Sequence, residues 1–337
     1  MMQIGATRAP TQPRPTAAQR PHRWGIGLVV VAALGVAEPA TAAPEGWNVL
    51  VDPAELAAML EGEPELRVLH IGWGFDDGHI PGAVEAPLSS FRGDLENPGA
   101  IPPLDRVFAK MRGWGLEPDA PTVVVHDGFS SGDFGNAARV YWSLKSLGVE
   151  EIAILNGGLA GWIEAGLPVS VAPTTPEPSR WEPTPDGTWR ITTEVLRERL
   201  AAGAPMTLVD ARPAPFFEGR ERHAAASRPG TIPGAVNLPF DAWFEGAVMR
   251  PADEVRAEIR ATGLVEAERP VVTFCNTGIF AATSWFALSE IAEIDDVRLY
   301  SSSMVEWSQA GGEMANVPGR VTHYWRMFAT WIADLFA

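Results

Sequence analysis

The sequence predicts an α/β protein of two tandem domains, each a mainly parallel sheet flanked by helices. The chain repeats itself weakly at a spacing of about 150 residues, which indicates a duplicated unit. Within each copy, short apolar runs alternate with helical patterns, an order typical of parallel strands covered by helices on both faces. The length of 337 residues also favours two domains over one.

Four sequence blocks of the first copy return in the same order in the second. The most obvious pair is Gly-His-Ile-Pro-Gly-Ala-Val at 78–84 and Gly-Thr-Ile-Pro-Gly-Ala-Val at 230–236. Blocks that recur in one order indicate copies of about 130 residues, an ordinary domain size. The matched blocks are 68–70 with 208–210, 78–84 with 230–236, 121–128 with 270–276, and 159–166 with 304–311.

The second copy shows its expected elements in a clear order. Pro251 stands at the first turn of one helix, where its missing N–H has no cost. Residues 271–274 form a mostly apolar run that predicts a buried strand. In chain order we expect helix 192–202, strand 207–210, strand 236–238, helix 251–262, strand 271–274, helix 281–291, strand 297–300 and helix 304–310.

Residues 1–42 have the composition of a secretory signal peptide. Arginines without any acid precede an apolar stretch at 24–37, and Ala40-Thr41-Ala42 offers a small-x-small cleavage site. The apolar stretch is short for a membrane span, which needs about 20 residues. We therefore expect a periplasmic or secreted mature chain without an integral span. A disordered basic tail is the alternative.

Beyond the signal we expect a first domain at 43–172, a Pro-rich linker at 173–190 and a second domain at 191–316. Proline at the density of the linker predicts an extended, semi-rigid connector. Aromatic residues near helical spacing predict a helical tail at 317–337 that docks on the body. A membrane-surface or partner helix is the alternative for this tail.

Charge and cysteine content exclude some classes of function. A net charge of −16 repels nucleic acid and anionic lipid, so we expect no nucleic-acid partner. A single cysteine allows no internal disulfide, although exported proteins fold in an oxidising compartment. We expect neither a cofactor nor a metal.

The single cysteine, Cys275, stands where the strand 271–274 ends and a helical pattern follows. A thiol at such a turn lies among backbone N–H groups at the positive end of a helix dipole, which favours the nucleophilic thiolate. We expect a sulfur within reach of solvent, encircled by amides of the next six residues. A buried, inert cysteine is the competing interpretation. The six residues are Asn276, Thr277, Gly278, Ile279, Phe280 and Ala281.

The repeat and the cysteine segment resemble the tandem-domain rhodanese family of thiosulfate and 3-mercaptopyruvate sulfurtransferases. The resemblance covers 48–316 and is most specific at 208–212, 230–239, 275–281 and 303–307. It implies a catalytic second domain and a first domain that has lost its cysteine.

Asp127 holds the place in the first copy that Cys275 holds in the second. A carboxylate cannot accept sulfur, so we expect the first domain to be inert in transfer and to form a wall of the cleft. The resemblance also makes His79 a candidate for that wall, because mercaptopyruvate enzymes place the matching histidine near the thiol. A turn histidine with local hydrogen bonds is the alternative.

The resemblance implies that a sulfane sulfur moves from thiosulfate, 3-mercaptopyruvate or a related donor to an acceptor, through a persulfide on Cys275. The acceptor would be cyanide, a small thiol or a thioredoxin-like protein. The first alternative is a sulfur-relay protein with a dedicated partner and little small-molecule turnover. The second is a scaffold with an inert thiol. Phosphatases of related fold need an arginine where Ala281 stands, which argues against phosphatase activity.

Several positions depart from the family pattern. Asn276 and Thr277 are neutral where thiosulfate enzymes carry cations, and Phe216 stands where the family has arginine. Arg220 and Arg222, in an insertion before residue 230, are candidates for the missing charge, and a solvated basic loop is the alternative.

Two charged residues after the strand 207–210 are expected to act on structure. Asp210 and Arg212 form an Asp-x-Arg pattern that can pair internally and fix the turn beside the cysteine loop. Direct contact with the substrate is the alternative.

Overall fold

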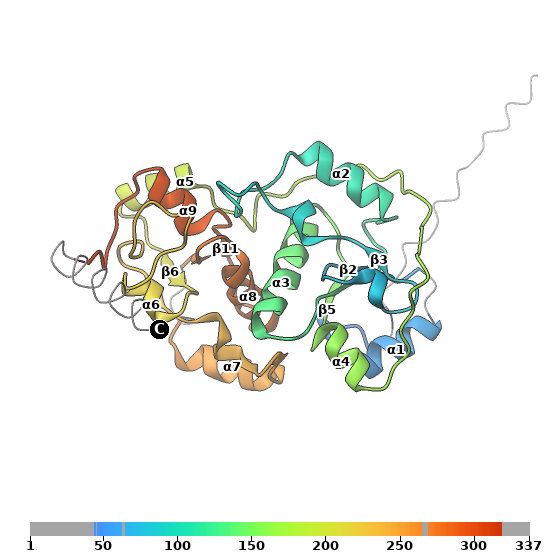
Figure 1. The fold of residues 1–337 in the computed structure, drawn as a ribbon. Helices are drawn as coiled ribbons and strands as arrows, with labels where there is room; N and C mark the ends of the chain where they lie inside the picture. Colours follow the sequence, from blue (N-terminus) through green and yellow to red (C-terminus); the bar gives the residue numbers. More distant parts are fainter. Residues whose placement is uncertain (1–43, 45, 63–64, 265–268, 319–337) are drawn as a thin grey trace, which may run out of the picture. The chain divides into compact units, whose positions relative to one another are not determined.

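The computed structural model describes residues 44, 46–62, 65–264 and 269–318 (Figure 1). The expected signal peptide at 1–42 and nearly all of the expected tail lie outside these residues. The described residues belong to one compact unit. Among the helices in this part of the chain, none combines the length and apolar character needed to cross a bilayer.

The first domain is built on a five-stranded sheet whose pairings are all parallel, in the order β1-β5-β4-β2-β3. Helices connect the strands, as parallel pairing requires. The strands are β1 (Leu50–Val51), β2 (Arg67–His70), β3 (Val84–Glu85), β4 (Thr122–Val125) and β5 (Ile152–Leu155). The helices are α1 (Pro53–Gly62), α2 (Leu104–Gly113), α3 (Ser131–Ser146) and α4 (Gly158–Glu164).

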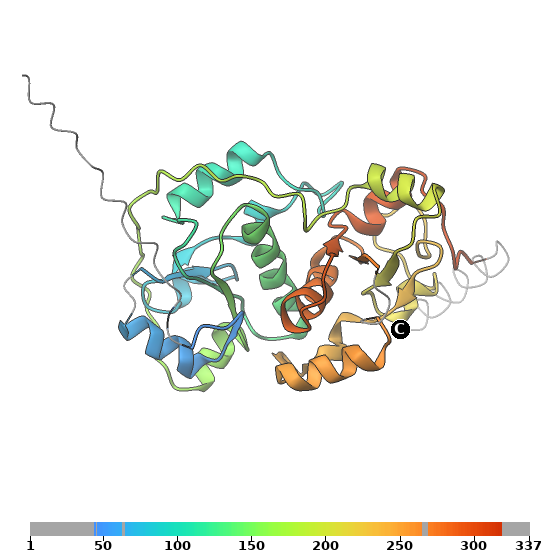
Figure 2. The ribbon, with the colours of Figure 1, turned by 180° about the vertical axis from the view of Figure 1, so that it is seen from behind.

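Helices cover both faces of this sheet, because successive side chains of a strand point to opposite sides. Val123 and Val125 of β4 pack in one apolar cluster with α1 and α4. Val124, between them, packs in another cluster with α2 and α3. The two layers can be followed from opposite sides in Figures 1 and 2.

The second domain has a four-stranded parallel sheet in the order β11-β10-β6-β7. A short antiparallel hairpin is formed by β8 (Phe244–Glu245) and β9 (Val248–Met249). The sheet strands are β6 (Thr207–Asp210), β7 (Val236–Asn237), β10 (Val271–Phe274) and β11 (Val297–Leu299). The helices are α5 (Thr193–Ala201), α6 (Ala214–Phe217), α7 (Ala252–Ala261), α8 (Ile279–Phe286) and α9 (Ser303–Gln309). The predicted class, α/β with two parallel sheets flanked by helices, is confirmed.

Most expected elements of the second domain appear within two residues of their predicted ends, and strands 207–210 and 271–274 match. Helix α8 begins at Ile279, two residues before the predicted start, and continues as a π-helical turn, Ala287–Ile291. Helix α6 and the hairpin β8–β9 are additional to the predicted elements. Both consist of segments that are too short to show a hydrophobic periodicity in the sequence.

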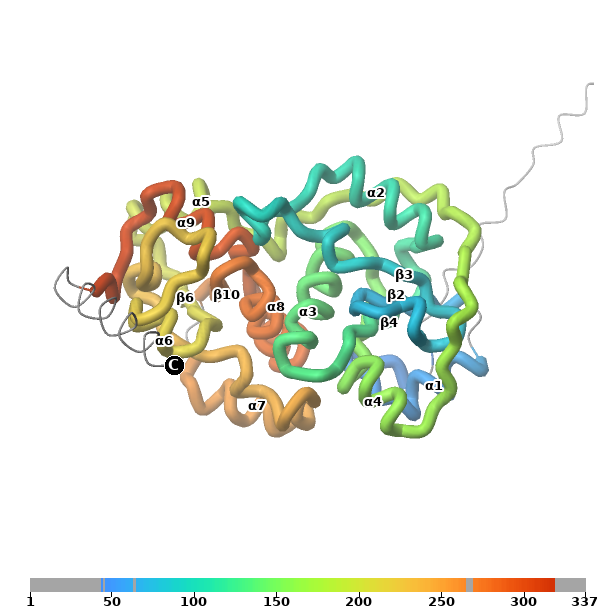
Figure 3. Tube along the Cα trace, viewed as in Figure 1, coloured from blue at the N-terminus to red at the C-terminus, as the bar shows by residue number. Residues whose placement is uncertain are grey.

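The linker, which can be followed in Figure 3, runs along the first domain. Backbone hydrogen bonds attach it there. The amide of Ser179 donates to the carbonyl of Arg112 at 2.9 Å, and that of Asp186 donates to the carbonyl of Ser146 at 2.7 Å. Trp181 and Trp189 pack against the apolar core. The expected boundaries of the first domain (43–172), the linker (173–190) and the second domain (191–316) remain predictions.

The two domains share one apolar cluster, centred on the contact between α3 and α8. The helices approach closely at Gly135, where a Cβ would lie only 2.9 Å from Cγ2 of Ile279. Polar contacts close the other end of the interface. The Tyr141 hydroxyl and the Lys145 ammonium donate to the Glu290 carboxylate at 2.7 and 2.8 Å. Burial and the Glu290 charge raise the pKa of Tyr141 well above its ordinary value, which keeps the hydroxyl a donor.

A buried histidine makes the stability of the first domain depend on pH. His126 is 1% exposed, and burial lowers its pKa from 6.5 to about 4. Between these values the unfolded chain binds a proton that the folded chain does not bind. The free energy of unfolding should therefore fall as pH falls through this window, by at most about 3 kcal/mol for this group.

We predict that His126→Phe will flatten this part of the pH profile. Urea unfolding at pH 7.0 and pH 4.5 should show a larger loss of stability in the wild type than in the variant. Equal losses in the two proteins would show that His126 takes up its proton while folded.

Candidate active site

The turn after β10 is held in place by the start of α9. The amide of Cys275 donates to Oγ of Ser303 at 3.0 Å, and the amide of Met304 donates to the Cys275 carbonyl at 3.1 Å. Gly278 adopts φ +77°, and a Cβ there would lie 2.3 Å from the carbonyl oxygen of Ser301. Only glycine therefore permits this turn to fit against its neighbour.

The sulfur of Cys275 accepts a hydrogen bond from the amide of Gly278, with N and Sγ 3.1 Å apart. Residues 279–281, expected in the encircling loop, instead form the first turn of α8. The expectation of a sulfur within reach of solvent is wrong for this structure, because Cys275 is only 2% exposed. The first domain and the start of α9 enclose the turn on sides that sequence patterns do not reveal.

An arginine of the first domain reaches this turn. Arg139 lies on α3 and is completely buried. Its Nη2 donates to the carbonyls of Phe91 and Gly99 at 3.3 and 3.1 Å. Its Nη1 has no partner within the described structure and lies 2.7 Å from the place that a Cβ on Gly278 would take. The guanidinium thus abuts the residue whose amide holds the sulfur.

A second arginine of the first domain lies in the electrostatic field of the thiol. Arg92 is half-buried, and its Nε donates to the carbonyl of Pro98 at 3.1 Å. Burial lowers the pKa of Arg92, and the Cys275 sulfur opposes this effect. Burial likewise lowers the pKa of Arg139 to about 9, with the charge of Arg92 adding to the shift and Cys275 opposing it. At a pKa of about 9, Arg139 is protonated at neutral pH.

The segment that carries Arg92 is anchored on the second domain. The amide side chain of Asn97 donates to the Glu306 carboxylate at 2.6 Å. Gln309 donates from Nε2 to the backbone carbonyl of Glu96 at 3.1 Å. These contacts with α9 fix the distance between Arg92 and the cysteine turn.

Neither arginine was predicted as a site residue, although the sequence contains one indication for Arg139. Arg139 is a lone cation within an apolar helical stretch that includes Ala137, Ala138 and Val140. A charged side chain in such a stretch is buried only when hydrogen bonds or an opposite charge compensate it. The position of Arg139 in the sequence therefore indicated that this residue has a specific role.

Asp210 and Arg212 form the internal pair that the sequence suggested. Arg212 donates from Nε and Nη2 to the two carboxylate oxygens of Asp210 at 2.9 and 2.6 Å. Its other amino group donates to Oδ1 of Asn276 at 3.3 Å. Because both side chains are almost fully buried, their contacts are those of a structural pair that braces the residue after Cys275.

The remaining supporting candidates make local contacts. Both ring nitrogens of His79 lie near carbonyl oxygens, those of Phe75 at 2.8 Å and Ala172 at 3.0 Å, as its turn alternative describes. Arg220 pairs with Glu218 at the surface. Arg222 donates to carbonyls of its own loop. These contacts tie both expected cations of the insertion to their own loop.

The expectation that Asp127 holds the place of Cys275 is wrong. Strand β4 ends at Val125 as β10 ends at Phe274, and the amide of Leu159 donates to the carbonyl of His126 as that of Met304 donates to Cys275. His126 therefore corresponds to Cys275, and Asp127 is the residue after it.

Oδ1 of Asp127 accepts from the amide of Trp73 at 2.9 Å, and burial raises the pKa of this carboxyl. A cavity of about 450 Å³ is lined by Asp127, Trp73, Leu95 and Arg92. The degenerate site of the first domain is thus an open cavity that includes one of the two arginines near the thiol.

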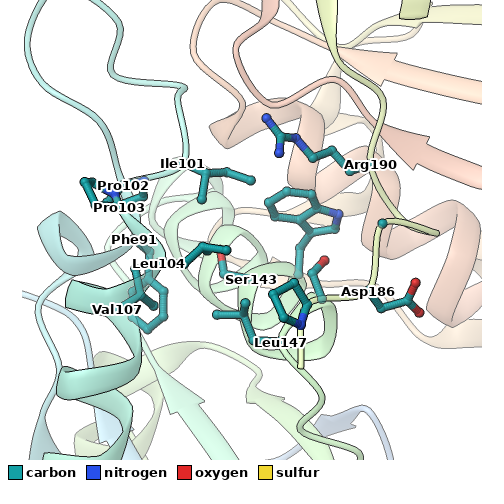
Figure 4. Close-up of a pocket in the computed structure, with 14 residues that line it drawn as sticks. Phe91, Ile101, Pro102, Pro103, Leu104, Val107, Ser143, Leu147, Asp186 and Arg190 are labelled. Atoms are coloured by element: carbon teal, nitrogen blue, oxygen red, sulfur yellow. The ribbon is translucent and has the colours of Figure 1, made fainter. Parts of the chain in front are cut away.

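A separate cavity of about 480 Å³ lies between the first domain and the linker (Figure 4). Phe91, Ile101, Leu104 and Leu147 give it a mainly apolar lining, and Arg190 stands at one side. No residue of 275–281 lines it. In the described part of the chain, no group of three or more His, Cys, Asp or Glu side chains is placed to hold a metal ion.

The sequence profile of the rhodanese-like domain matches residues 52–165 and 192–310. The chain belongs to the tandem-domain rhodanese family of sulfurtransferases. Thiosulfate sulfurtransferase from Gallus gallus is 30% identical over 254 residues, which cover 72% of this chain and 86% of that protein. 3-Mercaptopyruvate sulfurtransferase from Escherichia coli is 28% identical over 246 residues, which cover 72% and 83%.

Solved structures show the same rhodanese fold. SseA from Escherichia coli aligns with a TM-score of 0.64 at 24% identity, covering 76% of this chain and 98% of that one. Tum1 from Saccharomyces cerevisiae aligns with a TM-score of 0.67 at 21% identity, covering 81% and 99%. The family expected from the cysteine segment and the repeat is therefore confirmed.

The buried pair of this rhodanese should matter for stability. We predict that Arg212→Gln, which leaves the Asp210 carboxylate buried without its partner, lowers the free energy of unfolding by about 3–5 kcal/mol. The matched control is Arg298→Gln, since Arg298 pairs with Asp296 at the same 2.6 Å but partly in solvent. The control should cost less than about 1 kcal/mol in the same urea titration. Similar losses in both variants would contradict a structural role for the buried pair.

Proposed function

We propose that the protein is a sulfurtransferase in which Cys275 carries a persulfide between a small sulfur donor and an acceptor. Thiosulfate, 3-mercaptopyruvate or a related compound is the donor, and cyanide or a thiol is the acceptor. Family membership supports the reaction class. The observation that carries the proposal is the hydrogen bond from the Gly278 amide to Sγ at the carboxyl end of β10. Sites of parallel sheets form at such strand ends.

The reaction has two displacements at sulfur. The Cys275 thiolate attacks the transferable sulfur of the donor, a new S–S bond forms, and the bond to the donor breaks with its electron pair leaving on the donor remnant. The acceptor nucleophile then attacks the outer sulfur, and the Cys275 thiolate departs. The persulfide is anionic, so amides and nearby cations stabilise it without a metal.

The burial of Cys275 sets a condition on this mechanism. At 2% exposure, a donor reaches Sγ only when the turn or the side chains around it move. The same burial supports the alternative of an inert thiol. Persulfide formation decides between the two.

Because the chain has one cysteine, intact mass reports on it without ambiguity. We predict that thiosulfate or 3-mercaptopyruvate adds about 32 Da, the mass of one sulfur atom, to the wild type and nothing to Cys275→Ser. Cyanide should then remove the added mass. If neither compound nor any polysulfide loads the wild type, and the thiol reacts with iodoacetamide only as fast as the protein unfolds, Cys275 is inert.

One observation favours relay to a protein acceptor as a second function. Trp73, Leu95 and Phe129 are 89%, 88% and 83% exposed on the first domain. They line two cavities that meet at Trp73 and Asp127. Large apolar side chains grouped on a surface often mark a protein contact. The partner would be a thioredoxin-like protein whose thiol takes the outer sulfur.

We predict for this relay that Trp73→Ala slows transfer from the loaded persulfide to a thioredoxin-like acceptor by about tenfold. Transfer to cyanide should be unchanged, because cyanide needs no docking surface. The control is Val171→Ala, another exposed apolar residue of the described structure. Rapid steady-state turnover with cyanide or a small dithiol would make relay a minor function.

We further propose that residues 1–42 direct export and are removed, which places the enzyme in the periplasm or outside the cell. The order of basic, apolar and small residues supports this. N-terminal sequencing of the expressed protein should find Ala43 first.

A further inference from the structure

We propose that the first domain supplies the two cations of the thiol site. Arg139 stabilises negative charge on the Cys275 sulfur, and Arg92 binds the anionic group of the sulfur donor. This assignment rests on the proposed sulfur transfer and names the residues of the first domain that take part in it.

The placement of Arg139 is the first ground. A fully buried guanidinium normally satisfies each donor, since an unpartnered buried charge is costly. Nη2 of Arg139 meets three carbonyls, those of Phe91, Gly99 and Ala100, whereas Nε and Nη1 have no partner in the described chain. Nη1 points at Gly278, whose amide holds Sγ. The donors left over thus face the turn where negative charge forms in the reaction.

Arg92 is more exposed than Arg139 and therefore has a different role in the proposed site. It is half-buried, only its Nε is engaged within the protein, and it lines the cavity of about 450 Å³ in the first domain. A substrate in that cavity can therefore meet its terminal amino groups. The segment that carries Arg92 is also anchored on α9, the helix that holds the cysteine turn, through the Asn97–Glu306 and Gln309–Glu96 contacts.

The other charged groups near the turn come from several elements. Arg212 is neutralised by Asp210, to which it donates twice. Glu306 accepts hydrogen bonds from Asn97 and Thr193. From the insertion, burial lowers the pKa of His223, and the charges of Arg92 and Arg222 add to this effect. Arg190, from the linker, interacts with Arg139 and adds positive charge.

The turn itself is neutral, because Asn276 and Thr277 follow the cysteine. Cations placed on the first domain replace those that the turn lacks. Arg139 acts through the turn and is a positioning residue, whereas Arg92 contacts the donor. A second domain alone would keep its thiol but lack an anion site.

Two alkylating agents of similar size test this in the full chain. Iodoacetate is an anion and iodoacetamide is neutral, so the ratio of their rate constants with Cys275 reports local positive charge and cancels accessibility. We predict that Arg92→Gln lowers this ratio by about fivefold and Arg139→Gln by a similar factor. Arg92→Lys should retain most of it. The control is Arg106→Gln, which removes an exposed cation of the same domain.

The Michaelis constant for thiosulfate should rise in Arg92→Gln and not in Arg106→Gln. An unchanged alkylation ratio in Arg92→Gln, or a folded chain that neither reagent modifies, overturns the assignment. If Arg139→Gln does not fold, the Arg92 variants decide. A charge-dependent ratio in a protein that never forms a persulfide would support the cation site and refute the sulfur transfer, so the two failures are distinguishable.

Discussion

The buried guanidinium of Arg139 is the constraint on which the site depends. Removing such a charge from water costs several kcal/mol unless neighbours replace the lost hydration. Three carbonyls of the first domain and the Trp142 ring, 5.2 Å from the guanidinium carbon, replace part of it. The remaining side of the group faces Gly278 of the second domain. The cost of burying the charge therefore falls if negative charge develops on the neighbouring sulfur.

This arrangement gives the first domain a role after the loss of its own thiol. His126, the first residue after β4, stands where a cysteine would stand, and that domain keeps its full sheet. Its helix α3 packs on α8 closely enough at Gly135 to bring side chains to the cysteine turn. The two similar domains thus meet beside the cysteine turn, and a side chain of the first domain lies against the turn of the second.

Burial and chemistry are in tension at this site. The contacts that fix the turn also reduce Cys275 to 2% exposure. A low dielectric strengthens the attraction between a thiolate and nearby cations, but it also keeps substrates out. Movement of the segment that carries Arg92, which is held by the Asn97–Glu306 contact, would relieve this conflict. The Asn97–Glu306 contact joins the segment that carries Arg92 to α9, the same helix that holds the cysteine turn in place.

The sequence by itself determined the α/β class, the duplication, the cysteine at a strand end and the pairing of Asp210 with Arg212. Each of these follows from residues close together in the chain or from a repeat, where period and spacing carry the information. Only the tertiary structure decided that Cys275 is covered, that Arg220 and His79 make local contacts, and that Arg139 lies against Gly278 of the cysteine turn. The last of these depends on packing between residues more than a hundred positions apart, where no local pattern records which side chains meet.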